Sequence, residues 1–300
     1  MKLKNIFIFL LLSLVFSGCT TMGIIDANND SQGNLLVNVT SPVITEDYLL
    51  NVAMGNVPNA KMIHKFGRNP AIGTTRVPIT LSGIYQTPTT AKQLQIKSSS
   101  ALDTYSSTGG WTVKILGLNR TWQEEEIEIN LSGLTPVLIP VNFTRVYRAY
   151  VTKSGTYATS VLSSHQGIIT IEEVATGDDW ALINIDTGQG LGQTQIGVYS
   201  IEKGCKGYLL SKLINVEGTK PSTIYFFQRQ GINDTLVPYD TMRLVEQEDG
   251  VVGSLHVASR SIIRAFPELT DVGFMGKTGV GTAPISVDFE LLLICDHQVS

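Results

Sequence analysis

The stretch from Trp111 to Tyr150 constrains the fold most, because apolar and polar side chains alternate there with the period of a β-strand. From Glu126 to Leu131, glutamate and asparagine alternate with isoleucine and leucine, which is typical of an antiparallel strand with one face in water. A Gly-Leu-Asn-Arg turn at 117–120 precedes this run, so we expect a hairpin. Residues 137–151 predict one or two further strands. Because no helical pattern interrupts these strands, the chain is predicted to fold as β-sheet.

The composition supports an all-β protein that is large enough for two domains. The chain has 300 residues, of which 43% are hydrophobic and 16% charged, and 28 are glycine. This balance favours β-sandwiches with glycine turns over helix bundles or disorder. We therefore predict two β-sandwich domains, at residues 47–177 and 178–300, the second resembling a jelly roll. The formal net charge of −4 and the lack of a long Lys/Arg block give no reason to expect a nucleic-acid partner.

The second half of the chain has the strand spacing of a sandwich. Short apolar or alternating runs recur with Gly, Pro and Asp turns between them. The expected strands are 194–200, 207–216, 223–230, 242–245, 254–256, 261–265 and 285–296. The last strand alternates early and is continuously apolar late, as expected for a central strand buried on both faces. We expect it to pair with 207–216.

Residues 1–19 have the three regions of an export signal, in the expected order and size. Lys2 and Lys4 form a positively charged start, residues 6–16 form an apolar run too short to span a bilayer comfortably, and small residues precede Cys19. This stretch resembles a bacterial lipoprotein signal peptide, in which a lipobox of small residues precedes an acylated cysteine. An ordinary secretory signal, or an apolar N-terminus that is not cleaved, is the alternative.

The resemblance to lipoprotein signals implies that Cys19 is the lipid attachment site and the first residue of the mature chain. Phe16 departs from the pattern, which usually has leucine there. Thr20, rather than aspartate, follows the cysteine, which implies an outer-membrane lipoprotein of a Gram-negative cell. Residues 20–46 are rich in Asn, Asp, Ser and Gly. We expect them to form a flexible tether that holds the domains clear of the lipid headgroups.

Two further cysteines, Cys205 and Cys295, lie at strand edges in the last third of the chain. A chain exported to an oxidising compartment could join them in a disulfide. Strand cysteines also serve as small buried apolar residues, so two free thiols are an equal alternative.

His64, Lys65 and Arg68 lie in a polar run that also contains Gly67 and Pro70. One interpretation makes the three basic residues a binding patch. The interpretation that we favour makes the stretch a loop, whose aromatic residue plugs the edge of a core while its polar groups tie down the backbone.

The sequence carries no motif of a metal site or a catalytic centre. The histidines at 64, 165, 256 and 297 are isolated, and none has a second histidine or cysteine at metal-ligand spacing. Neither Gly-x-Ser-x-Gly nor His-Glu-x-x-His occurs. Glu124 and Glu126 could share one strand face, as glycosidase carboxylates would, but a solvated strand face is the simpler interpretation. We expect no enzyme activity, no cofactor and no metal.

Several segments, spread in order over roughly residues 48–300, carry a resemblance to a known family. They are 65–69, 113–118, 126–133, 145–152, 168–171, 198–208 and 287–294. Together they resemble virion structural proteins of tailed phages that infect marine bacteria. The resemblance implies a two-domain β protein that serves as a particle-surface, fibre or decoration component. The lipobox is a departure, since a virion part has no obvious need of a lipid anchor.

Two functions follow as hypotheses. The first is a non-enzymatic structural or adhesion protein, related to phage particle proteins and displayed through a lipidated N-terminus. The alternative is an outer-membrane surface lipoprotein that binds carbohydrate or excludes superinfecting phage. Its expected binding face is formed by exposed aromatics and one arginine, namely Tyr225, Phe227, Arg229 and Tyr239. The expected partners are the membrane, through the lipid anchor, and either phage particle proteins or a surface polysaccharide. By analogy with other sandwich heads we also expect a homotrimer.

Overall fold

The computed structural model describes residues 25–29, 35–39, 45–258 and 265–296. The predicted signal peptide and Cys19 lie outside these residues. The chain divides into two compact units, one ending at Val57 and one beginning at Pro58.

The first unit contains a two-stranded antiparallel sheet and a helix. Strand β1 (Ile25–Asn29) pairs with β2 (Leu35–Val39), and α1 follows at Thr45–Ala53. The segment predicted as a flexible tether therefore contains paired strands. The run from Leu35 to Val39 contains valines, which favour a strand. The tether was predicted from the Asn and Asp residues around this run, which outweighed its strand preference.

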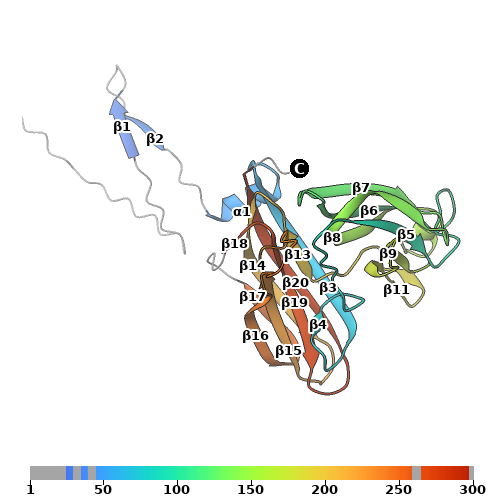
Figure 1. Ribbon diagram of the computed structural model, residues 1–300. Helices are drawn as coiled ribbons and strands as arrows, with labels where there is room; N and C mark the ends of the chain where they lie inside the picture. Colours follow the sequence, from blue (N-terminus) through green and yellow to red (C-terminus); the bar gives the residue numbers. More distant parts are fainter. Residues whose placement is uncertain (1–24, 30–34, 40–44, 259–264, 297–300) are drawn as a thin grey trace, which may run out of the picture. The chain divides into compact units, whose positions relative to one another are not determined.

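The second unit is almost entirely β, as predicted, and its strands fall into two lobes (Figure 1). The first, which we call the inserted lobe, spans residues 92–190. Its elements are β5 (Lys92–Ser98), β6 (Gly110–Asn119), β7 (Glu124–Asn130), β8 (Val137–Ser154), the short helix α2 (Tyr157–Ser160), β9 (Ile169–Glu173), β10 (Asp179–Ile183), β11 (Ile185–Asp186) and β12 (Gln189–Gly190). Six of them form one antiparallel sheet in the order β10-β9-β5-β8-β6-β7. The predicted β6–β7 hairpin is confirmed, but its turn lies between Asn119 and Glu124 and not at 117–120, because Gly117 and Leu118 are paired with β7.

The second lobe, which we call the composite lobe, takes strands from both sides of the inserted lobe. They are β3 (Ala60–Ile72), β4 (Val77–Pro78), β13 (Val198–Ile201), β14 (Cys205–Val216), β15 (Ser222–Arg229), β16 (Arg243–Val251), β17 (Gly253–Ala258), β18 (Ala265–Phe266), β19 (Thr270–Thr278) and β20 (Ala283–Cys295). One sheet has the order β17-β14-β20-β3 and the other β13-β19-β15-β16, with β18 and β4 attached. These orders are those of a jelly roll whose eight main strands form two four-stranded sheets, with β15 and β16 paired in the same sheet. The predicted pairing of the last strand with 207–216 is confirmed, because β20 pairs with β14.

The jelly roll does not lie wholly in residues 178–300, where we expected it. Its first strand is β3, which pairs with β20 from Ile72 opposite Ala283 to Ala60 opposite Ile294. The expected boundary after residue 177 instead separates β9 from β10, which pair with each other. The inserted lobe is therefore a long connection between the first and second strands of the jelly roll. The pairing of strands so far apart in the sequence leaves no local signal that would place the boundary correctly.

The polar run 64–70, predicted as a loop, lies inside β3. Gly67 and Pro70 suggested a break, but Gly67 has a packing role. A Cβ atom placed on it would come within 2.3 Å of the Gly197 Cα atom, closer than two carbon atoms can approach. The two glycines thus allow the backbones of two segments to touch.

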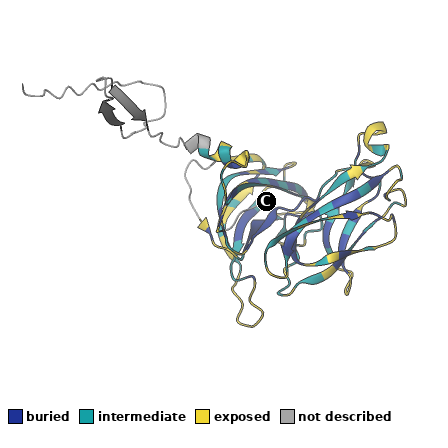
Figure 2. Cartoon of the chain, turned by 90° about the horizontal axis from the view of Figure 1, so that it is seen from above, coloured by how far each residue is buried: buried dark blue, intermediate teal, exposed yellow. Residues whose placement is uncertain are grey.

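Each lobe has its own hydrophobic core (Figure 2). The core of the composite lobe contains Phe226, Phe274 and Phe289, whose rings pack against one another with centroids 4.8 and 5.3 Å apart. Burying one such side chain contributes about 1.5–3 kcal/mol. Strand β15 is covered on both faces, because Phe226 enters this core whereas Phe227 belongs to the core of the inserted lobe.

Candidate functional site

The candidate site is the contact between the lobes, which we call the seam. Its side chains come mainly from β3 of the composite lobe and from β7 and β8 of the inserted lobe. It is defined by Lys61, Lys65, Glu124, Arg145, Tyr147, Arg148, Glu202 and Asp271.

A buried ion pair joins the two lobes in the seam. Arg145 on β8 donates to both carboxylate oxygens of Asp271 on β19, at 3.0 and 2.9 Å. The two side chains are 0% and 2% exposed. Arg145 also donates to the carbonyl oxygens of Pro88 and Thr144, at 2.9 and 2.7 Å. The guanidinium group is therefore well supplied with acceptors, which is the condition under which a buried charge is tolerated.

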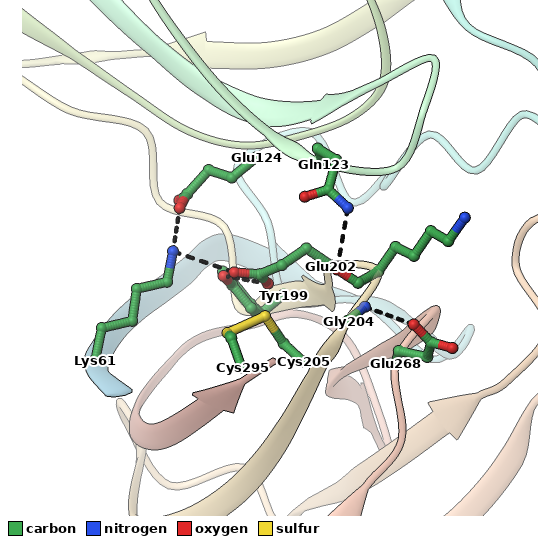
Figure 3. Close-up of a disulfide and its surroundings, with 10 residues drawn as sticks. Lys61, Gln123, Glu124, Tyr199, Glu202, Gly204, Cys205, Glu268 and Cys295 are labelled. Atoms are coloured by element: carbon green, nitrogen blue, oxygen red, sulfur yellow. Dashed lines mark hydrogen bonds and ion pairs between the residues drawn. A yellow bond between two sulfur atoms is a disulfide. The ribbon is translucent and has the colours of Figure 1, made fainter. Parts of the chain in front are cut away.

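At one end of the seam, which we call the closed end, a lysine lies between two carboxylates that neutralise its charge (Figure 3). Lys61 on β3 bonds to Glu124 and lies 3.1 Å from Glu202. Tyr147 and Tyr199 donate their hydroxyl groups to these same glutamates, at 2.6 and 3.1 Å. Burial disfavours the ammonium form, but the charges of Glu202 and Glu124 outweigh it and raise the pKa of Lys61.

Lys65 lies four residues further along the same face of β3, and its surroundings differ. The residue is 4% exposed, and its ammonium group donates to the carbonyl oxygen of Tyr147, beside the Tyr147 ring. No ion pair to a carboxylate joins it in the part of the chain that the structure describes. Burial, together with the positive charge of Arg148, lowers the pKa of Lys65 to about 7.

A cavity of about 120 Å³ opens beside Lys65. It is lined by His64, Lys65, Phe66, Arg148, Gln193 and Thr194. Arg148 is exposed, with its guanidinium group over the Tyr150 ring at 5.3 Å and one nitrogen 3.4 Å from the Gln193 side-chain oxygen. None of the six lining residues is acidic, so the walls of the cavity carry positive charge.

A disulfide between Cys205 and Cys295 lies next to the closed end of the seam (Figure 3). The two cysteines are opposite each other on β14 and β20, with Cα atoms 4.0 Å apart. Of the two alternatives that the sequence left open, the structure contains the bridge. Glu202 and the two sulfur atoms lie within 4.8 Å of one another, but sulfurs bonded to each other are not thiolates and do not ligate a metal.

His165 and Asp103 form a second buried polar cluster, inside the inserted lobe. Asp103 accepts hydrogen bonds from Ser98 and from the backbone N–H groups at 110, 166 and 167, at 2.6 to 2.9 Å. His165 is 0% exposed, and its Nδ1 atom lies 2.7 Å from the Ser164 hydroxyl. Serine, histidine and aspartate meet here, but Asp103 already accepts hydrogen bonds from backbone N–H groups, and the His165 ring has no access to solvent. The cluster therefore holds neighbouring loops in place and has no catalytic arrangement.

The expected aromatic binding face does not form. Tyr225 and Phe227 are each 6% exposed, because the face of β15 that was expected to meet solvent is covered. Tyr225 packs under Arg76, with 5.4 Å from the guanidinium carbon to the ring centroid. Arg229 is half-buried and donates to the Asp240 carbonyl at 3.3 Å, while Tyr239 is 42% exposed on the following loop. The four residues thus share no exposed surface.

Sequence reasoning missed most of the seam. Arg145, Asp271 and Glu202 were not singled out, although Arg145 lies in the stretch 137–151 that was predicted to form strands. A charged residue at an inward strand position is the signal that could have found it. Across the described ranges, no helix is long and apolar enough to cross a membrane.

Comparisons with known proteins add little. No protein-family model matches this chain, and no curated protein matches it. Among solved structures, the VP2 subviral particle of infectious bursal disease virus is similar at 8% identity, covering 86% of this chain and 84% of that chain, with a TM-score of 0.17. T=1 particles derived from the same virus match at 9% identity, covering 83% and 80%, again with a TM-score of 0.17. At TM-scores this low, the matches carry no argument about fold or function.

Proposed function

We propose that this chain is a non-enzymatic structural or adhesion protein, related to the particle-surface or fibre proteins of tailed phages and displayed through a lipid on Cys19. The proposal joins the sequence resemblance to the architecture of the described residues. A jelly roll carrying an inserted lobe presents two connected surfaces on one chain.

The buried pair of Arg145 and Asp271 is the observation that carries the proposal. It joins the lobes through a bidentate contact that is shielded from water. Such a contact fixes the orientation of two groups better than exposed pairs do. A protein that bears load or displays a surface needs that fixed arrangement. In the second buried polar cluster, Asp103 is bonded to backbone N–H groups and His165 is 0% exposed, so this cluster offers no exposed nucleophile and base together.

Fractionation with intact-mass measurement tests the anchor and the role together. The full gene is expressed in a Gram-negative host, the membranes are separated, and the mature chain is weighed. We expect a triacylated chain that begins at Cys19 in the outer membrane. The matched control is Cys19→Ala, which removes the acylated atom and should abolish both the mass increase and the membrane association.

An unmodified chain that starts at Met1 and occurs in the soluble fraction would contradict the lipid anchor. If that chain were also found in purified particles, the virion role would stand without the anchor. The alternative role of a carbohydrate-binding or phage-excluding lipoprotein shares the anchor. Of the aromatic face on which carbohydrate binding was based, Tyr225 and Phe227 are buried.

A homotrimer remains part of the proposal, by analogy between sandwich heads. Light scattering on the chain from residue 46 onward measures it directly. A monomer at micromolar concentration would contradict this part.

A further inference from the structure

We propose that the cavity beside Lys65 is a binding site for a compact oxyanion, a carboxylate or phosphate group carried by a ligand. The inference rests on the seam alone and does not depend on the proposed function.

The first step is the charge on Lys65. A buried ammonium group is normally paired with a carboxylate, because an isolated charge is costly to remove from water. Lys61, on the same strand face, has two carboxylate partners, but Lys65 has a backbone carbonyl oxygen. The described part of the chain therefore supplies no counter-charge for a lysine that is 4% exposed.

The second step is the neighbouring cation. Arg148 lies in the wall of the same cavity, and its charge acts against that of Lys65. Two cations beside one cavity repel each other, and an anion between them would replace this repulsion with two attractions. A guanidinium group also offers a fork of N–H donors that matches the oxygens of a carboxylate or phosphate. Gln193 adds an amide group at the same wall.

The third step is the position of the acidic groups. Asp288 and Glu290 on β20 lie opposite Phe66 and His64, whereas Lys65 lies opposite Phe289. Because paired residues in a sheet point to the same face and neighbours along a strand alternate, both acids lie on the face away from Lys65. Asp288 is moreover paired with His64 at 3.3 Å.

The fourth step is space and access. The volume of about 120 Å³ is well above the roughly 10–15 Å³ that one water molecule requires. The cavity is lined by three consecutive residues of β3, which is an edge strand. Edge strands carry unpaired backbone N–H groups, which can add donors to those of Lys65 and Arg148.

Calorimetric titration of the full chain at pH 6 tests the site, because Lys65 is charged there. The probes are inorganic phosphate and glucuronate, and glucose is the uncharged control. We expect saturable binding of at least one anion and no binding of glucose. Binding of phosphate alone identifies a phosphate group as the ligand chemistry, and binding of glucuronate alone identifies a carboxylate.

Two variants locate the binding. Lys65→Met and Arg148→Gln should each weaken it about tenfold or more, since each removes a hydrogen bond from a charged donor. The matched control is Lys212→Met. Lys212 is also buried, with a side chain 6% exposed, but it is already paired with Glu246 and Glu248, so its loss should not change the affinity.

Two results would overturn the inference. One is the absence of saturable binding by both anions. The other is unchanged affinity in Arg148→Gln, a variant of an exposed residue that should fold even if Lys65→Met does not.

Discussion

Lys61 and Lys65 lie on the same face of β3, four residues apart, but their surroundings shift their pKa values in opposite directions. Lys61 lies between Glu124 and Glu202, and its pKa is raised. Lys65 has a carbonyl oxygen and a neighbouring arginine, and its pKa is lowered to about 7. Burial alone therefore does not determine the charge state of a lysine, because the balance of nearby charges decides it.

The comparison also separates two roles within the seam. At the Lys61 end, the ammonium charge is neutralised by Glu124 and Glu202, and a disulfide lies next to it. This end therefore suits a permanent contact between the two lobes. The Lys65 end has excess positive charge and an adjoining cavity, so it suits a ligand from outside.

Removing the disulfide should produce the largest loss of stability. Cys205 and Cys295 are 90 residues apart in the sequence, and the loop-entropy model gives about 4–5 kcal/mol for a loop of that size. Urea unfolding of the double variant Cys205→Ala/Cys295→Ala measures the change. A reducing agent should lower the wild-type midpoint and leave that of the double variant unchanged. Equal stability of the two proteins without reductant would contradict the prediction.

Breaking the buried ion pair should have an effect of similar or slightly smaller size. Arg145→Met leaves the Asp271 carboxylate buried without its partner, which costs about 3–5 kcal/mol. The free energy of unfolding in urea measures the loss. Arg148→Gln is the control on the same strand, because its side chain is exposed and its replacement should change stability by less than about 1 kcal/mol.

The two lysines of β3 should respond differently to the same substitution. Lys61→Met leaves Glu202 buried and unpaired, and we expect a loss of about 2–4 kcal/mol, moderated by the tyrosine hydroxyls that remain. Lys65→Met removes an unpaired charge and one hydrogen bond, so it should change stability by about 1 kcal/mol or less in either direction. Parallel urea titrations compare them. Equal losses would show that the two ends do not differ.

The pH dependence of stability should show the most specific difference between the two lysines. Lys65 has a folded-state pKa of about 7, below the unfolded value near 10.5, so the unfolded chain binds more protons between these limits. Stability should therefore increase with pH from about 7 to about 10.5 through this group. Lys61, whose pKa is raised, contributes stability that is lost only as the pH rises beyond 10.5.

Unfolding curves of wild type and Lys65→Met across this pH range isolate the contribution of Lys65. The other groups that meet the seam there, Arg148, Tyr147, Glu124 and Glu202, are the same in both proteins. Parallel pH profiles for the two proteins would contradict the lowered pKa.

The sequence predicted the parts of the fold that depend on local alternation. The β6–β7 hairpin follows from residues 126–131, and the pairing of β14 with β20 follows from the long apolar run at the end of the chain. The role of β3 could not be predicted in this way. Its Gly67 and Pro70 have the local properties of a loop, and only the distant partners β20 and Gly197 explain them.

The candidate site was harder to predict than the fold. Alternation along β15 suggested that some aromatics face solvent, but a period of two cannot show that a second lobe covers the outer face, as it covers Phe227. Lys65 was singled out only as part of a polar run. Lys65 differs from Lys61 in its neighbours, because Glu124 and Glu202 are paired with Lys61 whereas Arg148 lies near Lys65. The sequence of β3 alone does not show these distant residues.

The position of β3 has a consequence for the order in which the protein is built. Every strand of the six-stranded sheet lies within residues 92–183, so this sheet has all its partners once that segment has left the ribosome. Strand β3 is made earlier, yet its partner in the sheet is the last strand of the chain. Non-local pairing of this kind slows folding and leaves an edge exposed in the meantime. Within the second unit, the six-stranded sheet of the inserted lobe can therefore form before the jelly roll, because β3 can pair only after β20 has been made.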